Sequence, residues 1–290
     1  GRSTSTSSMD LPSKVLKWMA NHAPWDSARQ SAFRKFCRRN LDVESRITTR
    51  HGFDMIVSIG DYVANWAAVY GVFEPGVTAL VKELARTETS LVDVGCNIGY
   101  HTCLFGAANP QARILSIDAN PEMTRRCERN VQLNGISATV VNCGVADRSG
   151  SMTLYCPERK PSLATFGGDP GKGGKIIEYQ VPVQPLDSLL EQHRFEEVGL
   201  LKVDVEGFEP LVLKSLRHEK ALRIRHMILE CSRKNFERCG FSLEEICGLD
   251  WLGQFDVRVI EDDGKTIPIR SLSALPDDRE NVWLKNRAAQ

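Results

Sequence analysis

The chain has 290 residues, and its 37 Lys and Arg residues are matched by 37 Asp and Glu residues, so its formal net charge is zero. A content of 42% hydrophobic and 26% charged residues is typical of a folded globular protein and excludes an intrinsically disordered chain. The lack of a basic excess argues against nucleic acid as a partner, and no apolar run reaches the roughly 18–20 residues that span a bilayer.

Cysteine usage and the N-terminus give weaker indications. The nine cysteines are an odd number without a CxxC pair, so neither a zinc site nor a disulfide framework is expected. Buried thiols in a reducing compartment are the expectation, which favours a cytoplasmic location. Residues 1–8 look like the remnant of an expression vector. An N-terminal extension of helix and strand is expected over 9–70, followed by the main domain at 71–290.

In chain order, residues 9–50 come first and are predicted to be helical, with a solvated basic face. A site for an anionic partner on that face is the less favoured alternative. Phe53–Ile59 predicts a strand. A helical stretch is predicted up to Tyr70, and a helix over Val77–Leu84 after the turn at Val72–Gly76.

From Ser90 onward, short apolar strands alternate with helices. The predicted strands are Leu91–Val94, Ala112–Ile117, Thr139–Val141, Leu200–Val205 and Met227–Leu229. Asn120 can cap the helix after the second strand, Pro121 suits its first turn and Gly135 ends it. Two strand pairs are also predicted, Met152–Tyr155 with Tyr179–Val183 and Phe255–Ile260 with Val282–Lys285. Strands separated by helices indicate a mostly parallel sheet with helices on both faces.

Ligands of such sheets bind beyond the carboxyl ends of the strands, so the residues that follow each strand are the candidate site. The first strand leads into Asp93-Val-Gly-Cys-Asn-Ile-Gly99. Its glycines are spaced G-x-x-x-G, and Asn97 stands where a dinucleotide-binding turn has its second glycine. The acidic Asp93 suits a cationic ligand better than phosphates. An ordinary strand-to-helix turn is the alternative.

The next two strand ends can supply the rest of a nucleoside site. Asp118 lies about twenty residues beyond the glycine turn, where an acid can bind both ribose hydroxyls; a simple exposed Asp is the alternative. Asn142, Cys143, Gly144 and Val145 follow the third strand. They offer a backbone edge and a small apolar pocket for adenine, or form an ordinary loop.

The fourth strand end is the most heavily charged. Alternation places Lys202, Asp204 and Glu206 on one side of the extended chain. A strand buried on both faces should not carry three ionisable groups without a reason, so a polar site is preferred over a structural salt-bridge cluster. Glu230 follows the fifth strand as part of the site or as a rim carboxylate. Together these ends suit S-adenosylmethionine (SAM), which combines a sulfonium cation, an amino-acid end, a ribose diol and adenine.

The chain resembles the FkbM-type family of SAM-dependent methyltransferases between about Gly71 and Cys231. The resemblance rests on blocks in the same order, namely Phe73–Gly76, Leu91–Tyr100, Ile117–Glu122, Arg129–Gly135, Pro185–Asp187 and Leu201–Glu209. It implies a class I methyltransferase (Rossmann-like) fold with a seven-stranded, mostly parallel sheet. It also implies SAM as the methyl donor and a hydroxyl or carboxylate acceptor on a small molecule or glycan.

The resemblance also implies residue roles. The methionine pocket would be shaped by Asp93, Gly95, Cys96, Asn97 and Gly99, with Glu74 near the same end. Asp118 and Ala119 would lie at the ribose, and the stretch 142–145 would border adenine. Cys96 replaces a common Ala, Asp118 a more usual Glu and Ala119 a Pro. The shorter acid must reach further to the ribose.

A hydroxyl acceptor must lose a proton, and we expect Asp204 or Glu206 to act as the general base, with Lys202 orienting the carboxylate or the acceptor. His101 is the alternative base, and a carboxylate acceptor would need none. No metal is expected; a divalent ion on Asp204, Glu206 and Glu230 is the less favoured alternative.

Other functions and features stay open at this point. A nucleic-acid or protein methyltransferase and a non-catalytic SAM-binding module are the rival functions. A nicotinamide dehydrogenase would need the missing G-x-G-x-x-G. The glycine-rich loop Pro157–Lys175 is expected to be mobile, with 165–175 as a candidate lid. The oligomeric state is left open.

Overall fold

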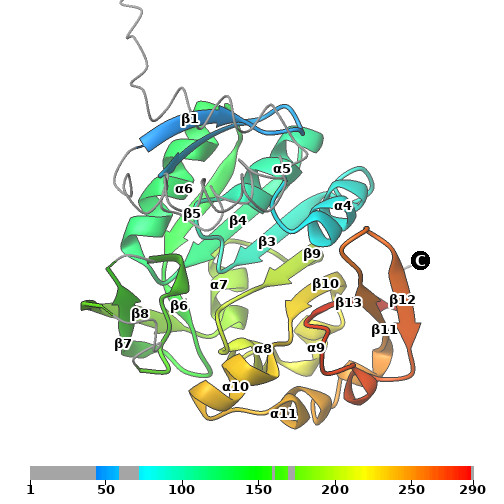
Figure 1. Ribbon diagram of the computed structural model, residues 1–290. Coiled ribbons are helices and arrows are strands. Elements are labelled where there is room, and N and C mark those ends of the chain that lie inside the picture. The colour runs from blue at the N-terminus through cyan, green and yellow to red at the C-terminus, as the bar shows by residue number, and fades with distance from the viewer. Residues whose placement is uncertain (1–43, 59–71, 159–160, 169–173, 289–290) are drawn as a thin grey trace, which may run out of the picture. The chain divides into compact units, whose positions relative to one another are not determined.

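The computed structural model describes residues 44–58, 72–158, 161–168 and 174–288 (Figure 1). The chain divides into two units, Gly1–Phe73 and Glu74–Gln290, which are described separately. In the first unit, β1 (Glu44–Thr48) pairs antiparallel with β2 (Asp54–Ser58). The strand predicted at β2 is confirmed. The helix predicted over 9–50 is wrong at β1, where exposed and buried residues alternate with the period of a strand. Residues 9–43 and the predicted helix up to Tyr70 lie outside the described residues.

The second unit is built on an eight-stranded sheet in the order β12-β11-β13-β10-β9-β3-β4-β5. Its parallel half contains β3 (Ser90–Val94), β4 (Arg113–Asp118), β5 (Ala138–Asn142), β9 (Val198–Val203) and β10 (Ile224–Glu230). Every residue of β3 and β9 is buried, as expected of central strands covered on both faces. Their carboxyl ends therefore lie side by side at one edge of the sheet.

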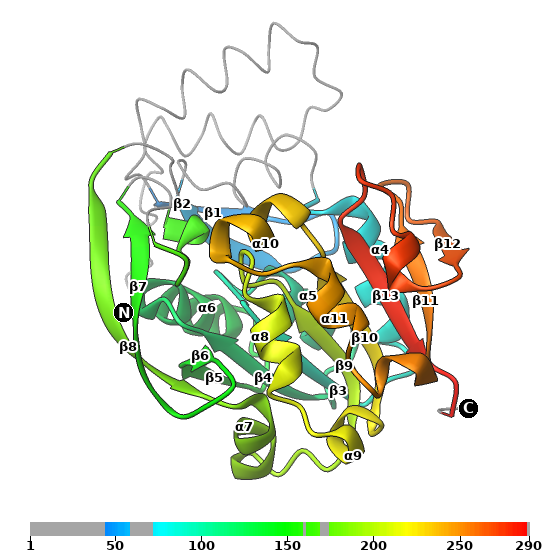
Figure 2. The same cartoon turned by 90° about the horizontal axis from the view of Figure 1, so that it is seen from below.

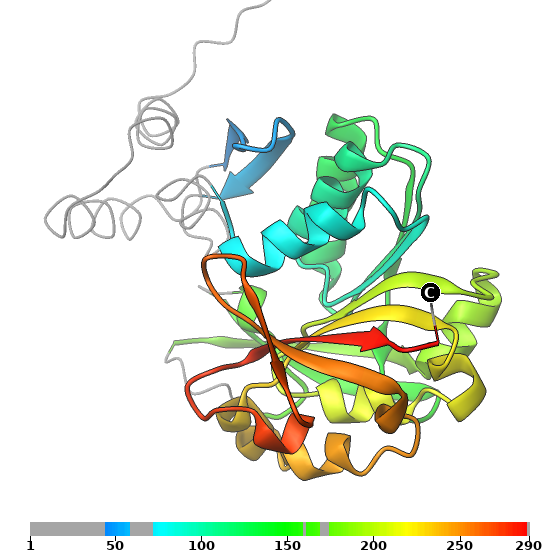
Figure 3. The same ribbon diagram turned by 90° about the vertical axis from the view of Figure 1, so that its right-hand side faces the viewer.

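Helices cover both faces of this sheet (Figures 1 and 3). One face carries α4 (Pro75–Leu84), α5 (Tyr100–Ala108) and α6 (Pro121–Leu133). The other carries α7 (Leu186–Gln192), α8 (Glu209–Lys214), α9 (His218–Ala221), α10 (Arg233–Cys239) and α11 (Leu243–Cys247), as Figure 2 shows. Side chains of these five helices share one hydrophobic core with the sheet. The predicted fold class, a Rossmann-like mostly parallel sheet with helices on both faces, is confirmed.

The whole sheet has eight strands, one more than the seven predicted, and the additional strand lies in its antiparallel part. The expected pairing of β11 (Phe255–Ile260) with β13 (Asn281–Asn286) is confirmed. The additional strand, β12 (Thr266–Ile269), pairs with the outer side of β11. Pro268 makes the sequence of β12 typical of a loop, but a proline is tolerated in a strand at the edge of a sheet. No helix in the described ranges has the length and apolar character that a membrane span requires.

A three-stranded sheet of β6 (Gly144–Val145), β8 (Ile176–Gln184) and β7 (Gly150–Pro157) follows β5. The predicted pairing of β7 with β8 is confirmed, and the two strands run antiparallel. Between β7 and β8, the 3-10 helix η1 (Pro161–Leu163) precedes Thr165, which bridges to Tyr155. Residues 169–173 of the candidate lid lie outside the described residues. Two further 3-10 helices, η2 (Leu252–Gln254) and η3 (Leu272–Ala274), flank β11 and β12.

The helix start predicted at Asn120 is confirmed in detail. The Asn120 side chain accepts a hydrogen bond from the Glu122 N–H at 3.0 Å, and Pro121 occupies the first turn. The stripe of Met123, Cys127 and Val131 is buried. This helix begins directly beyond β4, and its first turn therefore helps to form the edge of the sheet that carries the candidate site.

Candidate functional site

The glycine turn between β3 and α5 lies directly against the end of β9. Gly95 has a φ of 83°, and a Cβ atom there would lie 1.7 Å from the carbonyl oxygen of Asp204. Gly99 has a φ of 84°, and a Cβ atom there would lie 2.7 Å from the Cys127 sulfur. Only glycine satisfies both the backbone angle and the space at these positions. The turn also contains Asn97 in the left-handed region, at φ 51°.

Asp93, at the start of this turn, is a buried acid with an unused oxygen. It is 1% exposed, and its Oδ2 accepts a hydrogen bond from Thr102 Oγ1 at 2.8 Å. Its Oδ1 has no hydrogen-bond partner in the described part of the chain. Burial raises the pKa of Asp93, although Lys202 and the Thr102 hydroxyl act in the opposite direction. An unpaired buried carboxylate oxygen is a position that a cationic group can satisfy.

Asp118 connects the glycine turn with the start of α6. Its Oδ2 accepts the N–H of Asn97 and its Oδ1 the N–H of Asn120, both at 2.8 Å. Burial raises the pKa of Asp118 to about 6, with the two backbone hydrogen bonds opposing the shift. Both Asp118 and Ala119 are half-buried. The carboxylate therefore braces the turn, and its contact with a ribose stays a prediction.

Residues 142–145, predicted to border adenine, lie at the end of β5. The Asn142 side chain donates to the carbonyl oxygens of Asp118 and Ala119, both at 3.0 Å, and thereby joins two strand ends. Cys143, Gly144 and Val145 are buried. Phe166 lies against Gly144, where a Cβ atom would be 2.6 Å from the ring. The sequence reasoning missed Phe166, because nothing in the loop sequence indicates which strand end it covers.

Glu74 and His101 lie close to one another. Glu74 occupies the N-cap of α4 at φ 43°, and its Oε2 lies 3.8 Å from His101 Nε2. Burial raises the pKa of Glu74 to about 7, and burial lowers the pKa of His101 well below its ordinary value. The imidazole is therefore neutral near pH 7. His101 also lies 3.5 Å from Thr78 Oγ1 and is 5% exposed, so it is much less accessible than the carboxylates at the end of β9.

Lys202 and Asp204 form the charged pair at that strand end. Lys202 is buried, and its Nζ lies 2.9 Å from Asp204 Oδ2. Burial alone would lower the pKa of Lys202, but Asp204, Glu74 and Asp93 outweigh it and raise the pKa. The Asp204 N–H donates to the carbonyl of Val94 at 3.0 Å and ties this residue to β3. The predicted proximity of Lys202 and Asp204 is therefore observed.

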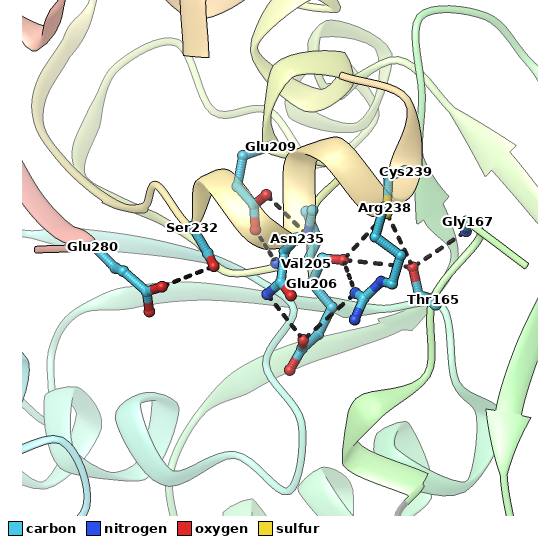
Figure 4. A network of polar contacts seen from close by, with 11 residues as sticks. Thr165, Gly167, Val205, Glu206, Glu209, Ser232, Asn235, Arg238, Cys239 and Glu280 are labelled. Atoms are coloured by element: carbon cyan, nitrogen blue, oxygen red, sulfur yellow. Dashed lines mark hydrogen bonds and ion pairs between the residues drawn. The ribbon is translucent and has the colours of Figure 1, made fainter. Parts of the chain in front are cut away.

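Glu206 does not join that pair. The strand ends at Val203, and Glu206 has a φ of 54°, so the predicted alternation stops before it reaches this residue. Its side chain instead turns toward α10, where Asn235 Nδ2 donates to Oε2 at 3.3 Å (Figure 4). Arg238 Nη2 donates to the Glu206 carbonyl oxygen at 2.9 Å. The expectation that Lys202, Asp204 and Glu206 share one side is wrong, because the chain leaves the extended conformation.

Glu209 is a further acid that sequence reasoning left without a role. It is fully buried at the start of α8, and one of its oxygens accepts the N–H of Val205 at 2.7 Å (Figure 4). The other oxygen accepts the N–H of Gly207 at 3.1 Å. Burial raises the pKa of Glu209 to about 8. Asp204, Glu209 and Glu230 each bring one carboxylate oxygen to within 4.8 Å of the others. Glu206, named in the predicted alternative for a metal, does not belong to this group.

The sequence is similar to those of known proteins. A model of the methyltransferase FkbM domain matches residues 93–256, more than half of the chain. "Methyltransferase 1" of Beauveria bassiana is 28% identical over 165 residues, which cover 51% of this chain and 66% of that protein. "Hexuronic acid methyltransferase AglP" of Haloferax volcanii is 28% identical over 145 residues, covering 49% and 56%. "31-O-demethyl-FK506 methyltransferase FkbM" of Streptomyces tacrolimicus is 24% identical over 164 residues, covering 48% and 63%.

The chain spans about two thirds or less of the length of these curated relatives. The matched region nevertheless begins at Asp93 and runs through Asp118, Asp204 and Glu230, so it contains the glycine turn and every strand end described above. The predicted resemblance is confirmed, and this chain belongs to the FkbM family of methyltransferases.

Proposed function

We propose that this chain is a SAM-dependent methyltransferase that methylates an oxygen atom, a hydroxyl or a carboxylate, on a small molecule or glycan. SAM is the cofactor that family membership assigns. Two of the relatives are named as a hexuronic acid methyltransferase and a 31-O-demethyl-FK506 methyltransferase, and the second name supports oxygen as the accepting atom. The observation that carries the proposal is the close approach of Gly95 to Asp204. Through it, the glycine turn, which is the candidate site for the methyl donor, lies next to a carboxylate that is a candidate base for the acceptor.

The residues at the glycine turn fit the cationic end of SAM. Asp93 Oδ1 and Glu74 Oε2 are buried carboxylate oxygens without a hydrogen-bond partner in the described part of the chain. A positively charged ligand would satisfy both oxygens and offset their desolvation. Asp118 retains lone pairs for the ribose, and the Asn142–Val145 edge would border the base. When bound, SAM supplies a methyl group on a positively charged sulfur.

Asp204 and Glu206 are the candidate bases for a hydroxyl acceptor. Their side chains are 24% and 25% exposed, against 5% for the whole of His101, so an acceptor can reach the carboxylates more readily. Lys202 holds Asp204 by an ion pair, and Asn235 holds Glu206 by a hydrogen bond. Each carboxylate is thereby oriented by a neighbour, which favours proton transfer in a fixed geometry. A carboxylate acceptor would need orientation alone.

The test is methyl transfer from labelled SAM to a panel of hexuronic acids, polyols and other hydroxylated small molecules, with nucleic acid and protein included. We expect transfer to one of the first three classes. Asp204→Asn and Glu206→Gln should bind S-adenosylhomocysteine (SAH) like the wild type in calorimetry, and the variant that lacks the base should lose about 10²–10⁴-fold in turnover. Glu237→Gln, an exposed acid on α10, is the matched control and should keep full turnover.

Unchanged turnover in both variants would rule out Asp204 and Glu206 as the base. Transfer to nucleic acid or protein alone would overturn the proposed acceptor class. SAH binding without transfer to any member of the panel would instead favour a non-catalytic SAM-binding module.

A further inference from the structure

Three carboxyl groups gather at the edge where β9 and β10 end. Asp204 follows β9, Glu230 ends β10, and Glu209 begins α8. One oxygen of each lies within 4.8 Å of the other two. A set made only of carboxylate oxygens is what hard divalent cations prefer, whereas zinc sites usually add nitrogen or sulfur ligands.

Glu230 provides an independent sign that something is missing from this group. Its Oε2 is shielded from solvent and has no hydrogen-bond partner among the residues that the structure describes. A shielded carboxylate oxygen without a partner is costly, and an added cation would remove that cost.

Among the residues that the structure describes, these three carboxyl groups have one cation in direct contact. Lys202 is the cation in direct contact, and it occupies only Oδ2 of Asp204. Glu209 uses one lone pair of each oxygen for the N–H groups of Val205 and Gly207, and a carboxylate oxygen can accept a second contact. Arg238 is directed at the carbonyl of Glu206 and lies 4.0 Å from the Glu206 carboxylate. One ammonium group therefore faces three carboxyl groups.

The spacing suits a coordinated ion. Ligands on opposite sides of Ca²⁺ lie about 4.6–5.2 Å apart, and those of Mg²⁺ about 4.0–4.2 Å apart, as twice the bond lengths require. A group spanning no more than 4.8 Å accommodates the first directly and the second after a small inward movement of side chains.

We propose that Asp204, Glu209 and Glu230 form a binding site for one hard divalent cation of the class of Mg²⁺, Mn²⁺ and Ca²⁺. This site differs from the expectation that no metal is held, and it contains Glu209 where the less favoured alternative had Glu206. Cation binding does not depend on methyl transfer. Where the proposed transfer also holds, the ion would lie beside Asp204 and reduce the repulsion between this edge and a carboxylate acceptor.

The test uses Mn²⁺ as the probe with the full chain, freed of any histidine tag and of metal. Loss of the free Mn²⁺ signal in electron paramagnetic resonance counts the bound ions, with and without SAH. We expect one site per chain, with Mg²⁺ or Ca²⁺ as competitors. Glu230→Gln should weaken Mn²⁺ binding at least about 10-fold. Glu237→Gln, the exposed acid on the adjacent helix α10, should bind like the wild type.

SAH binding and thermal unfolding serve as the control for folding, because Glu230→Gln removes a charge and nearly preserves the shape. Should this variant fail to fold, Asp204→Asn takes its place with the same expected loss of Mn²⁺ binding. The site is overturned by a wild-type chain that binds SAH but no Mn²⁺ at millimolar concentration. It is equally overturned if the ligand variant and Glu237→Gln bind Mn²⁺ with the same affinity. Either result leaves the proposed methyl transfer untouched.

Discussion

Replacing Gly95 by alanine tests the contact on which the proposed function depends. The substitution imposes two separate costs. Alanine at φ 83° must adopt a left-handed backbone, which costs about 1–2 kcal/mol. The new Cβ would also lie 1.7 Å from the carbonyl oxygen of Asp204, so the turn or the end of β9 must move. Overpacking of that kind costs typically about 1–3 kcal/mol. The expected loss in the free energy of unfolding is therefore about 2–5 kcal/mol.

The chain contains a control for each cost. Gly135 has a φ of 62° and nothing within 4 Å of an added Cβ, so Gly135→Ala should show the backbone cost alone. Gly76 lies in the first turn of α4 without a positive φ, and its Cβ would be 2.1 Å from the carbonyl oxygen of Glu261. Gly76→Ala should therefore show the steric cost, reduced by the higher helix propensity of alanine.

Urea denaturation of the wild type and the three variants gives the free energies, and calorimetry gives the affinity for SAH. Gly95→Ala should be less stable than Gly135→Ala by about 1–3 kcal/mol, which is the steric cost alone. It should also be the variant that loses SAH affinity most, because its turn must leave the edge of the sheet. Equal losses of stability in Gly95→Ala and Gly135→Ala would refute the close packing of the turn on Asp204.

Two further predictions concern buried acids beside this turn. Thr102→Val removes the hydroxyl that bonds Asp93 at 2.8 Å and Ser116 at 2.7 Å, and should cost about 1–3 kcal/mol in denaturation. Thr102→Ser keeps the hydroxyl and should cost less; an equal cost would contradict a role for the bond. Burial raises the pKa of Glu74 to about 7, so the folded chain keeps this proton at pH values where the unfolded chain has already released it. The resulting stabilisation of the fold is fully present below the unfolded pKa and is lost as the pH rises through 7. Glu74→Gln should therefore gain up to about 3 kcal/mol on the wild type between pH 5 and pH 8, and parallel stability curves would disprove the shift.

Much of the fold follows from local patterns. The strands β3, β4, β5, β9 and β10 were predictable because short apolar runs alternate with helices, and the start of α6 because Asn120 and Pro121 act within one turn. Prediction failed where the deciding contacts are distant. Residues 44–48 were predicted to be helical as part of the basic stretch 9–50, but they form a strand that pairs with β2. The sequence of β12 is typical of a loop, and it forms a strand because it pairs with β11.

The zero net charge conceals a concentration of acids at one edge of the sheet, and the sequence alone determined which acids these are. Strand periodicity is local, so Asp93, Asp118, Asp204 and Glu230 could each be placed at a strand end in advance. Only the tertiary structure decided their partners. Glu206 turns to Asn235 and Arg238, about thirty positions further along the chain, and Glu209 joins Asp204 and Glu230. These contacts depend on the order of the strands in the sheet and on the left-handed backbone of Glu206. Neither feature produces a periodic pattern from which it could be predicted in the sequence.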